Sequence, residues 1–160
     1  RRESVASVRD YADIWLTDFK YFDSSLGEIF LKAPDYFSVA AAALEQMVKQ
    51  TGEPVFDENE IMKRGVIVRH LMLPGHKDKK KNVLRFLHEN YGDSIWISIM
   101  NQYTPLCSDE RFPELSRTVS DEEYNEAIDF ACDIGIENAF VQEGGTVGES
   151  FIPPFDLSGV

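Results

Sequence analysis

The sequence is poor in cysteine and in basic residues, and it has no long apolar run. Its two cysteines, Cys107 and Cys132, are too few and too far apart for a disulfide framework or a cysteine-rich metal site. Lys and Arg number 16 against 28 Asp and Glu. The resulting net charge of −12 argues against a nucleic-acid-binding surface, which needs clustered cations. No run of about 18 apolar residues is present, so no membrane-spanning helix is predicted.

The amino-terminal segment, RRESVASVRD, also lacks the apolar stretch of a secretory signal peptide. Together with two reduced cysteines, this predicts a cytoplasmic protein that contacts neither membrane nor nucleic acid. Of the 160 residues, 43% are hydrophobic, which suits a single globular domain over residues 1–160. Residues 143–160 are predicted to form an irregular carboxyl-terminal loop, because glycine and proline interrupt every pattern there.

Apolar runs alternate with helical patterns along the chain. The runs are residues 14–16, 66–73, 95–100 and 138–142, and the helical patterns are residues 36–50, 80–90 and 120–135. Ser120 and Glu123 form a capping box at the start of the third helical pattern, and Gly135 can close it in a left-handed conformation. A further helix is expected to end within residues 4–11. Strand and helix in alternation predict a parallel sheet.

We therefore predict an α/β fold, a partial TIM-type (βα) barrel. It would have about four parallel strands in sequential order and three crossover helices on the outer face. A small doubly wound sheet with helices on both faces is the alternative. A half-barrel would leave two edge strands and the inward faces of its strands uncovered, which natural domains avoid. The chain is therefore expected to self-associate, or to be part of a longer protein that supplies the missing strands.

Right-handed crossovers place the carboxyl ends of parallel strands at one rim, where sites in α/β proteins form. The polar residues that arrive there are Asp18, Lys20, Arg69, His70, His76, Asn101, Gln102, Tyr103, Gln142 and Glu143. Side chains alternate along a strand, so Asp18 and Lys20 share a side, while Arg69 and His70 diverge. Asp18 and Lys20 could form a structural ion pair. Alternatively, Lys20 and Arg69 could bind a carboxylate while Asp18 binds an amine.

Three chemistries suit such a rim, and the residue pattern alone leaves them open. Lys20 could form a Schiff base with a carbonyl substrate, as in class I aldolases. A metal site from His70, His76 and Glu143 is not favoured, because these residues lack compact ligand spacing. The third option is a cofactor that carries a carboxylate, an amine and a base, which the mixed charges and amide groups of the rim suit. A non-catalytic domain that uses the rim for binding or assembly is a further alternative.

Four segments occur in a familiar order: DIWLTDFKY (13–21), GVIVRHLMLPGH (65–76), ISIMNQYTP (97–105) and SDEEYNEAIDFACDIGIENAFVQE (120–143). They resemble radical SAM proteins of the pyruvate formate-lyase activating enzyme family. The resemblance extends from about Ala12 to Pro154, nearly the whole chain. It implies an oxidoreductase that reductively cleaves S-adenosylmethionine with a [4Fe–4S] cluster, forming a 5′-deoxyadenosyl radical that activates a glycyl-radical enzyme.

By this resemblance, Asp18, Lys20 and Arg69 match the family's groups around the methionine part of S-adenosylmethionine. Gln102 and Tyr103 stand where family members often bring a histidine to the adenine. Together with the other polar residues at the rim, the predicted cofactor-binding residues are Asp18, Lys20, Arg69, His70, Gln102, Tyr103, Gln142 and Glu143. No catalytic residue and no metal ligand is predicted within this chain.

The family's C-x3-C-x2-C motif, which supplies three thiolates to the cluster, does not occur in these 160 residues. The chain therefore resembles the carboxyl-terminal half of a radical SAM barrel, and alone it is expected to bind no cluster and to be inactive. The implied partners of the parent protein are a glycyl-radical enzyme or another protein substrate, and a flavodoxin or ferredoxin as electron donor.

Overall fold

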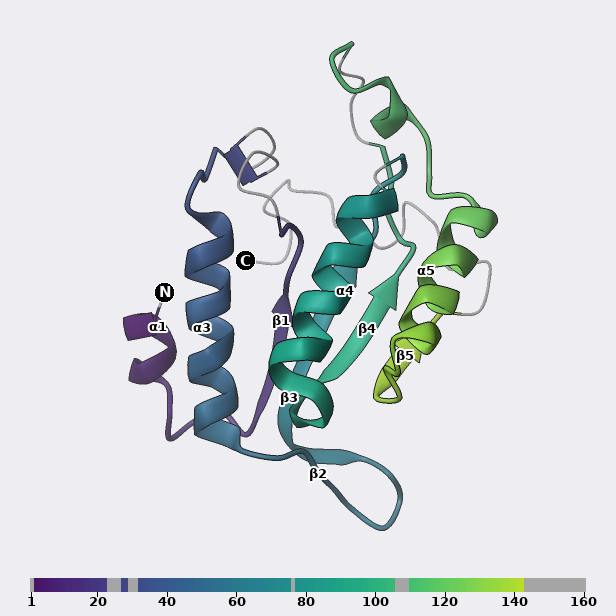
Figure 1. The fold of residues 1–160 in the computed structure, drawn as a ribbon. Helices are drawn as coiled ribbons and strands as arrows, with labels where there is room; N and C mark the ends of the chain where they lie inside the picture. The colour runs from purple at the N-terminus through teal and green to yellow at the C-terminus, as the bar shows by residue number, and fades with distance from the viewer. Residues whose placement is uncertain (1, 23–26, 29–31, 76, 106–109, 143–160) are drawn as a thin grey trace, which may run out of the picture.

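The computed structural model describes residues 2–22, 27–28, 32–75, 77–105 and 110–142 (Figure 1). The helices are α1 (Arg2–Ser7), α3 (Tyr36–Thr51), α4 (Lys77–Tyr91) and α5 (Asp121–Asp133), with short 3₁₀ turns η1 (Gly92–Ser94) and η2 (Pro113–Ser116). The strands are β1 (Ile14–Asp18), β2 (Val55–Phe56), β3 (Met62–Leu71), β4 (Trp96–Met100) and β5 (Ala139–Val141).

The sheet has the predicted parallel arrangement. Strands β1, β3, β4 and β5 lie side by side in that order, and each pairs in parallel with the next. Helices α3, α4 and α5 connect them and lie together on one side of the sheet (Figure 1). The predicted α/β fold with four sequential parallel strands and three crossover helices is therefore confirmed. It is consistent with a partial (βα) barrel and not with a doubly wound sheet.

Strand β2 was not predicted from the sequence. It pairs antiparallel with the first residues of β3 and forms a short hairpin. The Asp57 carboxylate stabilises the hairpin turn by accepting the N–H groups of Asn59 and Ile61, both at 2.9 Å. Phe56 packs edge-on against Trp96 of β4, with ring centroids 5.2 Å apart. With only two residues, β2 is too short for any period-2 pattern to mark it.

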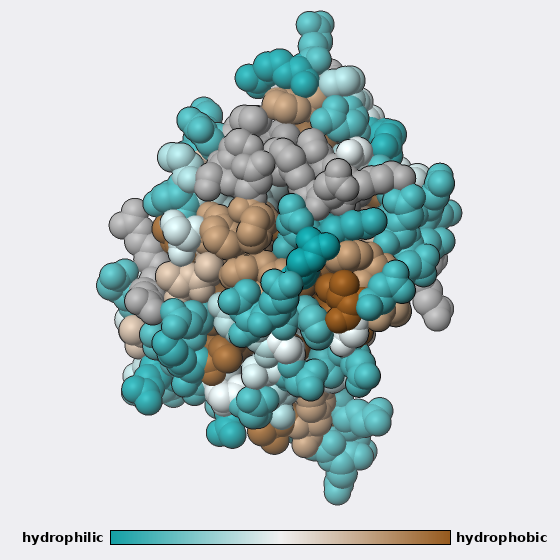
Figure 2. Space-filling view, in the orientation of Figure 1, coloured by the Kyte–Doolittle hydropathy of each residue, from teal (hydrophilic) through white to brown (hydrophobic). Residues whose placement is uncertain are grey.

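Alternate residues of the central strands face the helices and form the core. Val66 and Val68 of β3, Met72 directly after it, and Ile97 and Ile99 of β4 are almost fully buried. From the helices, the main contributors to the same core are Leu44, Met47, Val83, Leu84, Leu87, Tyr124, Ala127 and Ala131. Figure 2 shows the helix-bearing side, where hydrophilic side chains lie around and between several apolar patches.

The other set of alternate residues forms a second, open face of the sheet. Trp15 and Phe19 pack into the core beneath the helices, so Ile14, Leu16 and Asp18 face the opposite way. Leu16 is 57% exposed, and Phe140 of β5 is 44% exposed. Among the described residues, no helix covers this face. The burial of the sheet is thus one-sided, as expected for a barrel wall whose interior is not enclosed.

The buried Glu123 carboxylate joins three segments at the carboxyl end of the sheet. It forms the predicted capping box with Ser120, whose hydroxyl accepts the Glu123 N–H at 3.2 Å while the carboxylate accepts the Ser120 N–H at 3.1 Å. It also accepts the Gly75 N–H at 2.8 Å and pairs with both terminal nitrogens of Arg117, at 2.6 and 3.0 Å. The loop after β3 is thereby attached to the connector before α5.

Replacing this carboxylate should destabilise the fold. In Glu123→Gln the ion pair and the charge-assisted hydrogen bonds are lost, and we expect the free energy of unfolding to fall by about 2–4 kcal/mol. Glu122→Gln, an exposed position in the same helical turn, is the matched control and should cost less than about 1 kcal/mol. Chemical denaturation of the two variants measures the difference. Equal losses would contradict the account of Glu123 as a structural junction.

We further predict that the isolated chain self-associates through the open face. Burying a Leu, Ile or Phe side chain contributes roughly 1.5–3 kcal/mol, and several such side chains lie exposed there. Sedimentation equilibrium at micromolar concentration should therefore show a dimer, and Leu16→Lys should shift it to monomer. Tyr11→Lys, at an exposed position outside the sheet, should leave the dimer intact. A monomer of 18.2 kDa for the unmodified chain would refute this prediction.

Candidate functional site

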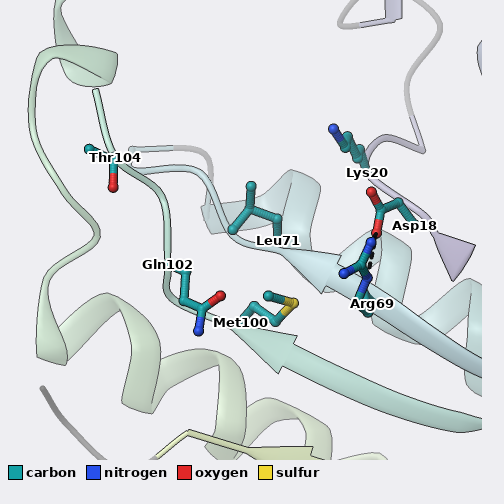
Figure 3. A pocket seen from close by; sticks show the side chains of 7 residues that line it. All are labelled: Asp18, Lys20, Arg69, Leu71, Met100, Gln102 and Thr104. Carbon is teal, nitrogen blue, oxygen red and sulfur yellow. Dashed lines mark hydrogen bonds and ion pairs between the residues drawn. The ribbon is translucent and has the colours of Figure 1, made fainter. Parts of the chain in front are cut away.

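A cavity of about 210 Å³ lies on the open face at the carboxyl ends of β1, β3 and β4 (Figure 3). Its lining residues are Asp18, Lys20, Arg69, Leu71, Met100, Gln102 and Thr104. All come from the same alternating set, and Gln102 and Thr104 continue the line of β4 beyond its last residue. The four predicted site residues Asp18, Lys20, Arg69 and Gln102 are therefore brought together. They lie around an apolar floor made by Leu71 and Met100.

Asp18 and Arg69 form an ion pair at one wall of the cavity. The parallel register places Asp18 directly beside Arg69. Both Nε and Nη2 of Arg69 lie 2.7 Å from the same carboxylate oxygen of Asp18. Their side chains are 43% and 39% exposed, so the pair contributes no more than about 1 kcal/mol to stability. The sequence suggested a structural pair between Asp18 and Lys20, but in the structure Asp18 pairs with Arg69.

Lys20 lies on the same side of the chain as Asp18, two residues further on (Figure 3). Its side chain lines the cavity, and within the described part of the chain its ammonium group makes no ion pair. The cavity thus combines Lys20, which can bind an anionic group of a ligand, with Arg69, whose side chain is already oriented by the Asp18 carboxylate.

His70, the neighbour of Arg69, does not reach the cavity. Its side chain points under the helices and is 2% exposed. Its Nδ1 lies 3.0 Å from the carbonyl oxygen of Phe19, so the ring donates a hydrogen bond to the residue that directly follows β1. Successive side chains of a strand point to opposite faces, and therefore Arg69 and His70 cannot both line one cavity. The structure does not support direct contact between His70 and a ligand in the cavity.

Tyr103 and Gln142 make structural contacts at the same end of the sheet. The Tyr103 hydroxyl donates to the carbonyl of Leu115 at 2.9 Å. The Gln142 side-chain oxygen accepts the Asn101 N–H at 3.1 Å, and the Gln142 N–H donates to the Tyr124 hydroxyl at 2.6 Å. Neither residue lines the cavity. Glu143, like His76 and Cys107, lies outside the described residues.

Leu71, Met100 and Thr104 were not predicted as site residues. Leu71 lies two positions after Arg69, and Met100 lies two positions before Gln102. The two-residue period of a strand could therefore have identified both. Thr104 extends the same series. Tyr36, whose hydroxyl contacts the backbone at Lys20, had no such signal, because it lies sixteen positions away at the start of a helix.

The buried Tyr21 and the half-buried Tyr36 lie next to the end of β1, and their rings meet edge-on with centroids 5.7 Å apart. Burial raises the pKa of Tyr21 to about 12, and the nearby phenols of Tyr36 and Tyr103 add to the effect. Burial also raises the pKa of Tyr36, although the hydrogen bond from the Lys20 N–H opposes this rise. Both phenols are therefore neutral hydrogen-bonding groups at physiological pH.

Among the described residues, no cluster of three or more His, Cys, Asp or Glu side chains could hold a metal ion. In the same part of the chain, no helix has the length and apolarity needed to cross a membrane. Cys132 is exposed on α5 and lies outside the cavity. The charged and amide side chains that line the cavity can recognise a small ligand by charge and by hydrogen bonds.

The sequence was compared with protein families and with curated proteins. No family profile matches the sequence. An uncharacterized protein of Methanocaldococcus jannaschii is 27% identical over 130 residues, which are 81% of this chain and 34% of that protein. The chain thus spans about a third of the length of this curated relative.

Among solved structures, the chain is similar to a domain of the pyruvate-formate lyase-activating enzyme from Bacteroides vulgatus. The TM-score is 0.57 with 17% sequence identity, and the match covers 89% of this chain and 75% of that domain. At this identity the likeness concerns the fold. The chain therefore shares its α/β fold with a domain of an activating enzyme.

Proposed function

We propose that this chain supplies the methionine-binding side of an S-adenosylmethionine site in a radical SAM oxidoreductase similar to glycyl-radical-enzyme activating enzymes. The shared fold supports the proposal, but a fold alone does not define an activity. The observation that carries it is the cavity, where two cations and one carboxylate meet around two apolar side chains. These groups complement an amino acid that has an apolar side chain.

The methionine part of S-adenosylmethionine carries an ammonium group and a carboxylate. The carboxylate suits Lys20 together with Arg69, since hydrogen bonds between charged partners are the strongest in proteins. The ammonium group suits Asp18, whose carboxylate offers about four acceptor sites and can keep Arg69 while it binds a second donor. Leu71 and Met100 offer apolar contact to the methylene groups that lead to the sulfonium sulfur.

The size of the cavity matches a part of the cofactor. Sites that enclose a whole small molecule usually have roughly 300–1,000 Å³, and this cavity has about 210 Å³. The chain's residues therefore fit the methionine part, while the adenosine part would need groups from outside the cavity. Gln102 and Thr104 lie toward one side of it and can orient the bound ligand by hydrogen bonds (Figure 3).

The residues of this chain do not fit the cluster that the family resemblance implies. A [4Fe–4S] cluster that binds S-adenosylmethionine needs three thiolates, and this sequence has two cysteines. In the proposed parent protein the cluster would be held by cysteines outside these residues, and it would supply the electron for cleavage. A flavodoxin or ferredoxin as reductant, and a glycyl-radical enzyme or other protein as substrate, belong to the same proposal.

The proposal predicts turnover by the protein at the full length that its gene encodes. After anaerobic reconstitution and reduction, it should convert S-adenosylmethionine to 5′-deoxyadenosine. Arg69→Gln should raise the KM for S-adenosylmethionine about 10- to 100-fold, the effect of losing a charged hydrogen bond. Arg64→Gln, at the exposed opposite end of the same strand, is the matched control and should leave KM unchanged.

Two results would overturn this function. One is the absence of 5′-deoxyadenosine from the reconstituted wild-type protein. The other is covalent trapping of a carbonyl substrate on Lys20 by borohydride, which would identify a class I aldolase-like lyase instead. Equal effects of Arg69→Gln and Arg64→Gln would reject the cavity as the cofactor site.

A separate prediction concerns the 160-residue chain alone. With two cysteines it should bind no [4Fe–4S] cluster after anaerobic reconstitution, and it should not cleave S-adenosylmethionine. Visible absorbance and iron analysis measure the cluster content. A stoichiometric cluster would contradict the prediction, and Cys132→Ser would then test whether two chains share it through this exposed thiol.

A further inference from the structure

The peptide group between Phe19 and Lys20 is held at both ends by side chains. Its oxygen accepts a hydrogen bond from Nδ1 of His70 at 3.0 Å. Its N–H donates to the hydroxyl of Tyr36 at 2.8 Å. The Phe19 N–H, one residue beyond β1, still donates to the Arg69 carbonyl at 2.9 Å. The Phe19 N–H thus makes the last backbone hydrogen bond between this segment and β3. At the next peptide group, the side chains of His70 and Tyr36 provide the hydrogen bonds instead.

The Tyr36 ring is itself well anchored. Tyr36 is the first residue of α3, and its N–H donates to the Ala33 carbonyl at 3.1 Å. The ring packs edge-on against Phe19, at 6.4 Å between centroids, and against Tyr21, at 5.7 Å. These two residues flank Lys20 in the sequence. Tyr36 therefore contacts the chain before, at and after Lys20.

This arrangement determines where the Lys20 side chain points. Phe19 and Tyr21 are both buried in the aromatic layer on the helix side, where Phe19 also stacks on Phe86. The residue between two such anchors must direct its side chain the other way, toward the cavity that Lys20 lines. A lysine ammonium is carried by a flexible four-carbon side chain. Fixing the backbone of Lys20 therefore reduces the range of positions that its ammonium group can occupy.

We propose that Tyr36 and His70 are positioning residues of the cavity: they fix the Phe19–Lys20 peptide group and thereby direct Lys20 toward the carboxylate of the ligand. The proposal rests on the proposed function for the identity of that ligand. It gives His70 a role without ligand contact, and it assigns a role to Tyr36, which does not line the cavity. Neither residue is among those that line the cavity.

The backbone part of the proposal can be tested without any ligand. Tyr36→Phe keeps the ring and removes the acceptor, so amide hydrogen exchange of Lys20, followed by NMR, should accelerate about tenfold, the factor for one lost hydrogen bond. Tyr91→Phe, at a half-buried ring that packs on Phe86 at the end of α4, is the matched control and should leave Lys20 exchange unchanged. Unchanged exchange in Tyr36→Phe would overturn the proposal.

The ligand part is tested with S-adenosylmethionine and the reconstituted full-length protein. Tyr36→Phe should raise KM several-fold with little change in kcat, and it should add nothing in a Lys20→Met background, because both changes remove the same interaction. A purely structural Tyr36 would instead act additively with Lys20→Met, which would overturn the proposal.

His70 offers a rescue experiment. His70→Asn keeps a nitrogen donor near the position of Nδ1, whereas His70→Leu removes it. We expect the Asn variant to retain a lower KM than the Leu variant when both are compared at equal folded fraction. Equal KM values would overturn the role of His70. Failure of the wild-type protein to bind S-adenosylmethionine would reject the proposed function, while the exchange experiment would still decide whether the peptide group is fixed.

Discussion

The parallel pairing of β1 with β3 and of β3 with β4 is the constraint on which the other features depend. In such a ladder every side chain must point to one of two faces, and the register decides which side chains become neighbours. Because Asp18 pairs with Arg69, a carboxylate and a guanidinium meet on the open face. The same pairing places His70 under the helices. Shifting the register by one residue would reverse both outcomes.

One-sided burial connects this constraint to function. The helix-bearing face holds the core that stabilises the chain. Residues on the open face are therefore not needed for the core and can bind a ligand. At one end of that face the exposed side chains are apolar, as at Leu16, while at the carboxyl end they are charged. A surface of this kind suits the interior wall of a barrel, with packing below and ligand recognition at the rim. Tyr36 and Glu123 then fix the loops that carry the rim.

Much of the fold could be predicted because its signals are local. The capping box at Ser120 and the apolar runs of β3 and β4 depend on residues close in sequence. The ion pair of Asp18 with Arg69 could not be predicted, since it depends on the register of two strands fifty-one positions apart. The contact of Tyr36 with Lys20 requires the helix to return over the strand. The distinction between Arg69 and His70 was implied by alternation, but which of them faces the helices is decided by tertiary packing.

The central claim is that ligand recognition occurs on the open face of the sheet and leaves the helix-covered core unchanged. The four methionines provide a direct measurement, because Met100 lines the cavity and Met72 is fully buried beneath the helices. In the full-length protein labelled at the methionine methyl groups, titration with S-adenosylmethionine should shift the NMR signal of Met100 and leave that of Met72 in place. A shift confined to Met72, or no shift of Met100 at saturating ligand, would contradict the account.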